Sequence, residues 1–136
     1  GWATGAPHLV DVLNRIRGPF NVASGAQATA LAALGDTGFV EESRSHNASQ
    51  RARFVQSIAA LNNAGVRVLP SQANFVLVLF ASADMAGAVQ TELARGGYAV
   101  RHLGGALGHA LRITIGTTAQ MDEVAALLRA AVEDGQ

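Results

Sequence analysis

The stretch Ala110-Leu-Arg-Ile-Thr-Ile-Gly-Thr117 predicts a short β-strand with one arginine among apolar residues. Burying the Arg112 guanidinium between apolar neighbours is costly unless an anion pairs with it, so Arg112 is a candidate carboxylate receptor. Two alternatives stay open. Arg112 could lie on an exposed strand face, or it could pair with an internal acid such as Asp122 or Glu123.

A second strand is predicted over residues 74–80, within the longest apolar run of the chain, Phe75-Val-Leu-Val-Leu-Phe-Ala81. This run is far shorter than the roughly 20 residues that a membrane-spanning helix needs. Further strands are expected over residues 66–69 and 98–102. Helical spacing of apolar residues predicts helices over 7–17, 22–34, 37–64, 83–95 and 118–133.

The predicted order of elements is αααββαββα. Helices followed by closely successive strands favour an α+β fold, a two-layer sandwich in which helices cover a small, mostly antiparallel sheet of about four strands. The long third helix is expected to be capped by Asp36 or Thr37 and to end at Gly65. Its predicted buried stripe consists of Phe39, Val40, Phe54, Val55, Ile58 and Leu61.

The composition predicts a single domain over residues 1–136, because 136 residues with 49% apolar content suffice for one core. Ten arginines balance ten acidic residues, so bulk charge favours neither nucleic acid nor a membrane surface. The absence of cysteine excludes disulfides and fits a cytoplasmic protein. The four histidines lack the spacing of metal ligands, and no metal site is expected.

The first residues, Gly1-Trp-Ala-Thr-Gly5, contain neither an initiator methionine nor a signal sequence, which suggests a piece of a longer protein. The chain also has no lysine. Chemistry that needs a side-chain primary amine is therefore not available from these residues, because neither arginine nor histidine can replace it.

Five short motifs occur in order along nearly the whole chain: Gly1-Trp-Ala-Thr-Gly5, Arg15-Ile-Arg-Gly-Pro-Phe-Asn-Val22, Ser71-Gln-Ala-Asn-Phe75, Val100-Arg101 and Leu111-Arg-Ile-Thr-Ile-Gly-Thr117. Together they resemble the C-terminal third of histidinol-phosphate aminotransferases. Related enzymes that act on aromatic amino acids, or that decarboxylate a phosphorylated threonine, share much of this pattern.

The resemblance implies the small C-terminal domain of a fold-type I transaminase that depends on pyridoxal 5'-phosphate (PLP). In such enzymes this domain closes over the substrate, and the whole protein is usually a homodimer. The family's Schiff-base lysine lies before the segment that matches Gly1-Trp-Ala, so this chain is expected to be inactive alone and to bind no PLP covalently. The implied reaction belongs to histidine biosynthesis and transfers an amino group between histidinol phosphate and 2-oxoglutarate.

The resemblance also implies four substrate-binding residues. Arg112 matches the arginine that receives the substrate carboxylate, and Arg101 matches one that helps to bind the substrate phosphate. Arg101 could instead be a polar residue pointing outward from a strand. Asn74 and Asn21 match positions near the active site, although hydrogen bonding to the backbone of a turn is the favoured interpretation of Asn74 and ordinary turn chemistry also explains Asn21.

The remaining candidates favour structural roles. The glycine-rich loop over residues 104–108 joins two strands and lacks the strand-to-helix context of a phosphate loop. Trp2 and Tyr98 could stack on a ligand, but apolar packing is the favoured role of both, and His102 is expected at the surface. Two other functions stay open: an autonomous module that binds an amino acid or a phosphorylated metabolite, and a packing or dimerisation domain.

Overall fold

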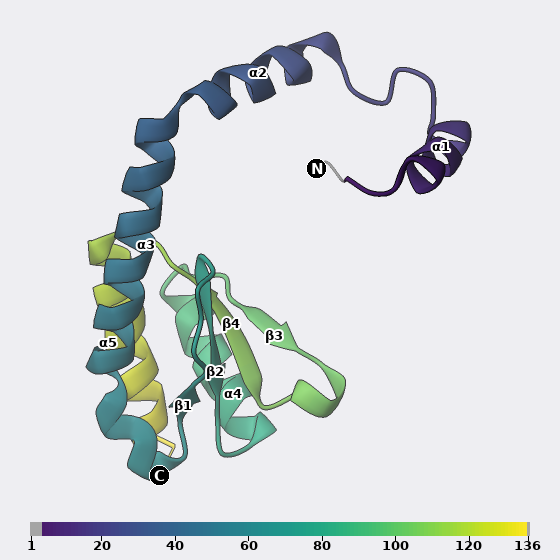
Figure 1. Ribbon diagram of the computed structural model, residues 1–136. Coiled ribbons are helices and arrows are strands. Elements are labelled where there is room, and N and C mark those ends of the chain that lie inside the picture. The colour runs from purple at the N-terminus through teal and green to yellow at the C-terminus, as the bar shows by residue number, and fades with distance from the viewer. Residues whose placement is uncertain (1–3, 136) are drawn as a thin grey trace. The chain divides into compact units, whose positions relative to one another are not determined.

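The computed structural model describes residues 4–135, which divide into two units with a boundary between Val40 and Glu41 (Figure 1). The first unit contains α1 (Pro7–Ile16), α2 (Ser24–Gly35) and the start of α3 (Thr37–Ser57). No residue described before Glu41 is buried. Whether residues 1–136 form one domain stays a prediction.

The helix starts in the first unit follow local signals. Pro7 occupies the first turn of α1, where its missing N–H removes no helical hydrogen bond. Asp36 precedes α3, and its Oδ1 accepts a hydrogen bond of 3.0 Å from the main-chain N–H of Phe39. The prediction of an Asp36 cap is therefore confirmed.

The second unit begins within α3 and holds all of the strands. Its other elements, in chain order, are the 3₁₀ helix η1 (Ala59–Ala64), β1 (Arg67–Val68), β2 (Phe75–Leu79), α4 (Ala83–Arg95), β3 (Arg101–Leu103), the 3₁₀ helix η2 (Gly105–Leu107), β4 (Ala110–Thr114) and α5 (Thr118–Glu133). This order confirms the predicted α+β fold.

The four strands form one sheet in the order β1-β2-β4-β3, and every neighbouring pair is antiparallel. Side chains alternate between the two faces of each strand. The buried face carries Val76 and Val78 from β2 and Leu111 and Ile113 from β4. These four residues pack in one core with side chains from the second half of α3, from α4 and from α5. The helices therefore cover one face of the sheet.

The predicted stripe on the long helix is only partly correct. Phe54, Ile58 and Leu61 are buried, whereas Phe39 is 65% exposed and Val40 and Val55 are exposed as well. Helical periodicity predicts which side chains share a face, but it does not supply a partner for that face. The helix itself ends at Ser57, earlier than predicted, because Ile58 leaves helical geometry before the 3₁₀ turn.

The start of β3 also differs from the prediction. β3 begins at Arg101, not at Tyr98, because the main-chain N–H of Tyr98 donates to the Leu93 oxygen at 2.8 Å and so belongs to the end of α4. The glycine-rich loop between β3 and β4 contains the 3₁₀ turn η2. The His102 Nε2 lies 2.5 Å from the Gly108 carbonyl oxygen, which ties β3 to the end of this turn.

Gly65 ends the 3₁₀ helix in the left-handed conformation, with a φ of 79°. A Cβ atom at this position would lie 2.8 Å from the Cβ of Ala81, so there is room only for glycine. The predicted stop at Gly65 is confirmed. Within residues 4–135, no helix is long and apolar enough to cross a membrane.

We expect Leu128→Ala to lower the free energy of unfolding by about 2–5 kcal/mol, because Leu128 is 0% exposed and its removal leaves a cavity in the core. Leu107→Ala is the matched control, since Leu107 is 43% exposed and its truncation should change little. Urea unfolding of both variants measures the difference. Equal losses of unfolding free energy in the two variants would contradict the burial of Leu128 in the core.

The Tyr98 hydroxyl donates a hydrogen bond of 2.6 Å to the Glu123 carboxylate. This hydrogen bond raises the pKa of Tyr98 above its ordinary value, helped by burial and by the charge of Glu123. A raised folded-state pKa means that the stabilisation is complete below the unfolded pKa, about 10, and is lost as the pH rises through the folded value.

Tyr98→Phe should therefore have a lower melting temperature than the parent chain at pH 8, and the difference between the two melting temperatures should shrink as the pH rises. Thermal melts of both proteins from pH 8 to pH 11 measure it. A gap that stays constant over this range would contradict a role for the hydroxyl proton.

Candidate functional site

The two candidate arginines face each other across one pair of strands. Arg101 of β3 and Arg112 of β4 are direct register partners in the antiparallel sheet. Side chains at directly opposite positions project from the same face, with Cβ atoms about 4.5–5.5 Å apart. This is the face turned away from the helices, because the flanking residues Leu111 and Ile113 are buried in the core.

Like charges placed directly opposite each other destabilise a sheet unless something lies between them. No residue of opposite charge relieves this pair: none of the ion pairs within residues 4–135 involves Arg101 or Arg112. An anion bound by both guanidinium groups would neutralise the repulsion and gain charge-assisted hydrogen bonds. The register thus creates a site suited to a carboxylate or a phosphate.

The Arg112 side chain is half-buried, and its Nε is fully buried without a hydrogen-bond partner among the described residues. Among the described residues, no ion pair joins Arg112 to either of the internal acids considered as its partner. Asp122 pairs with Arg53, and Glu123 accepts from Tyr98. A buried donor without an acceptor is unfavourable, and it is typical of a group that awaits a ligand.

An aromatic ring completes the surroundings of Arg112. The guanidinium carbon Cζ lies over the ring of Phe75, 5.2 Å from its centroid. This distance is within the range of a cation–π interaction. One strand therefore carries the guanidinium and the next strand carries the ring that lies against it.

The family of the chain follows from its similarity to known proteins. Residues 1–128 match the sequence profile of the family Aminotransferase class I and II. The chain belongs to this family.

Relatives named histidinol-phosphate aminotransferase align with all or nearly all of the chain. It is 53% identical over 137 aligned positions to the histidinol-phosphate aminotransferase of Erythrobacter litoralis, and the match takes in 100% of this chain and 37% of the relative. The enzyme of that name from Zymomonas mobilis is 47% identical over 97% of this chain and 36% of its own length. The chain thus spans about a third of the curated relatives that it matches.

The fold agrees with a solved structure from the same group. The crystal structure of histidinol-phosphate aminotransferase from Sinorhizobium meliloti, in complex with pyridoxal-5'-phosphate, superimposes with a TM-score of 0.84 at 30% sequence identity. The superposition covers 96% of this chain and 35% of that one. This similarity confirms the α+β architecture of an aminotransferase domain.

Asn74 lies directly before β2. Its main-chain oxygen accepts from Ile115 at 2.9 Å, which joins β2 to the end of β4. Ser71 holds the turn before it. Its hydroxyl donates to the main-chain oxygen of Phe75 at 2.6 Å and accepts from the main-chain N–H of Ala73 at 3.1 Å. The Asn74 side chain does not hold this turn. It is exposed and lines a hollow of about 610 Å³ beside α3.

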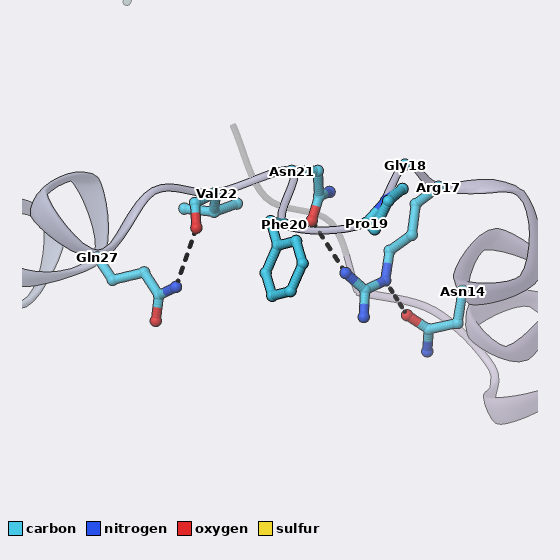
Figure 2. A pocket seen from close by; sticks show the side chains of 8 residues that line it. All are labelled: Asn14, Arg17, Gly18, Pro19, Phe20, Asn21, Val22 and Gln27. Carbon is cyan, nitrogen blue, oxygen red and sulfur yellow. Dashed lines mark hydrogen bonds between the residues drawn. The ribbon is translucent and has the colours of Figure 1, made fainter.

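Asn21 belongs to the first unit, in the loop between α1 and α2. Figure 2 shows the Arg17 guanidinium between two amides, donating at 2.9 Å from Nη1 to the Asn21 Oδ1 and at 2.9 Å from Nε to the Asn14 Oδ1. Phe20, beside Asn21, has a φ of 53° and is 98% exposed. The hydrogen bond from Arg17 favours turn chemistry as the present role of the Asn21 amide.

Two features of the site escaped sequence reasoning. Phe75 ends the motif Ser71-Gln-Ala-Asn-Phe75, but nothing in the sequence placed its ring against Arg112. The pairing of Arg101 with Arg112 was also not predicted, because strand register depends on the length and shape of the intervening turn. Within residues 4–135, no three histidines, aspartates or glutamates cluster as metal ligands do.

We expect anions to stabilise this chain through the arginine pair. At equal ionic strength, phosphate should raise the melting temperature more than chloride, because a bound oxyanion relieves the repulsion between Arg101 and Arg112. Arg101→Gln and Arg112→Gln should each reduce the phosphate-specific shift. Arg95→Gln is the control, since Arg95 lies on α4 and pairs with Glu92. A phosphate effect that survives both substitutions would rule out the pair as the anion site.

Proposed function

We propose that residues 1–136 form the C-terminal small domain of a PLP-dependent aminotransferase that uses histidinol phosphate and 2-oxoglutarate, in the histidine biosynthesis of the cytoplasm. The observation that carries this proposal is the arginine pair, in which Arg112 holds a buried donor without a partner and Arg101 stands opposite it. The relatives named histidinol-phosphate aminotransferase support the choice of substrates.

The role of this chain would be to bind and orient the substrate anion. A guanidinium offers two parallel N–H donors to two carboxylate oxygens, which fixes the direction of the molecule as well as its position. Arg112 would take the carboxylate of the keto acid, and Arg101 would contribute to binding the phosphate of the other substrate. Fixing the substrate in this way brings its reacting carbon to a defined place, which lowers the entropic part of the barrier.

The chemistry at the reacting carbon would come from the cofactor. When bound, PLP acts as an electron sink for bond breaking at the carbon that carries the amino group. This chain has no lysine, so its side chains offer no amine to hold PLP covalently. We therefore assign the Schiff-base lysine to residues outside this sequence, and we expect these residues alone to be inactive.

Asn74 and Asn21, each in its own unit, are also proposed to bind substrate. Asn74 is exposed next to Phe75, and its amide has no hydrogen bond to any described residue, so it is available to a polar substrate group. Asn21 would need to release the Arg17 guanidinium before it could bind a substrate. The enzyme that contains this chain is proposed to be a homodimer.

The test is steady-state kinetics on the full-length enzyme that carries this chain. Arg112→Ala should raise the KM for 2-oxoglutarate and lower kcat/KM at least roughly tenfold, because about 1.5–3 kcal/mol is lost with each hydrogen bond to a charged group. Arg112→Lys should recover only part of this loss, since lysine keeps the charge but not the planar fork. Arg101→Gln should affect the KM for histidinol phosphate more than that for 2-oxoglutarate.

Arg95→Ala serves as the control, because Arg95 is an exposed residue of α4 outside the sheet. An Arg112→Ala enzyme with unchanged KM and kcat would defeat the assignment of Arg112.

A further inference from the structure

The proposed function assigns no role to the contact between the Phe75 ring and the Arg112 guanidinium. The guanidinium carbon lies over the ring at 5.2 Å, and both side chains are half-buried on the face of the sheet that the helices leave free. A phenylalanine can neither accept nor donate a proton here. Its effect on Arg112 must therefore be geometric and electrostatic.

The register explains why these two side chains meet. Leu77 of β2 is the direct partner of Arg112, and Phe75 lies two residues earlier on the same face. Phe75 is thus a diagonal neighbour of Arg112, at a separation that aromatic and long side chains can bridge. Their contact follows from the sheet itself, so the ring is held in place by the pairing of β2 with β4.

A ring against one side of a guanidinium restricts it in a useful way. The ring attracts the positive charge through its face and leaves the N–H groups at the guanidinium edge available. An arginine side chain has large rotamer freedom, which it would otherwise lose when it binds an anion. A guanidinium that is already held in its binding orientation loses less entropy on binding, so it binds the anion more tightly.

We propose that Phe75 is a positioning residue, whose ring holds the Arg112 guanidinium in the orientation that receives a substrate carboxylate. This inference rests on the proposed function of Arg112. It assigns to Phe75 an effect on substrate affinity that acts through Arg112 and not through contact with the reacting atoms.

The test compares variants of the full-length enzyme. Phe75→Leu keeps an apolar side chain but removes the ring, and it should raise the KM for 2-oxoglutarate roughly three- to tenfold with a much smaller change in kcat. Phe75→Tyr keeps the ring, so this variant should have the same KM for 2-oxoglutarate as the parent enzyme. If Phe75→Leu does not fold, Phe75→Ile is the second variant, because isoleucine favours strands.

Leu79→Ala is the matched control, since Leu79 is half-buried on the same face of the same strand. It should leave the KM unchanged even if it lowers the melting temperature. The double variant Phe75→Leu/Arg112→Ala completes a cycle: without a cation at position 112, the loss of the ring should add nothing to the KM.

The outcomes separate the two proposals. If Arg112→Ala raises the KM but Phe75→Leu behaves like Leu79→Ala, the positioning role is overturned and the function of Arg112 stands. The positioning role is likewise overturned if the effects of Phe75→Leu and Arg112→Ala simply add. If Arg112→Ala itself has no effect, the proposed function fails, and the positioning role fails with it.

Discussion

The pairing of β2, β4 and β3 in one antiparallel register is the constraint on which the rest of this structure depends. Because side chains alternate along a strand, one register sends Leu111 and Ile113 into the core and Arg112 to the opposite face. A shift by a single residue would exchange the two faces and bury the guanidinium among apolar helices. The stability of the core therefore also holds the candidate site in place.

The candidate site itself works against the stability of the sheet. Two arginines stand directly opposite each other, and the Arg112 Nε is buried without an acceptor in the described residues. Each feature is unfavourable in the absence of a ligand. The core beneath these arginines stabilises the fold and offsets this cost, since Val78, Leu111 and Leu128 are all fully buried. Unfavourable local arrangements are common where a protein binds a charged ligand.

Much of the fold could be predicted because its signals are local. The bounds of α4 and α5 agree with the helical periodicity, Asp36 caps α3, and Gly65 ends the following turn. The apolar stripe on the long helix was less predictable. Its second half meets the core, but Phe39 and Val40 lie in the first unit, where no described residue is buried. Periodicity reports a shared face, while burial needs a partner.

The sequence by itself determined the kinds of elements, their order and the family of the chain, and it singled out Arg112 as a candidate anion receptor. An arginine within an apolar strand is visible without coordinates, since the cost of burying its charge is a property of the residue and its neighbours. Only the tertiary structure decided which residues stand beside it. Arg101 and Phe75 lie beside Arg112 on two neighbouring strands, and their positions depend on strand register, which the turns and the burial of one face of the sheet set together.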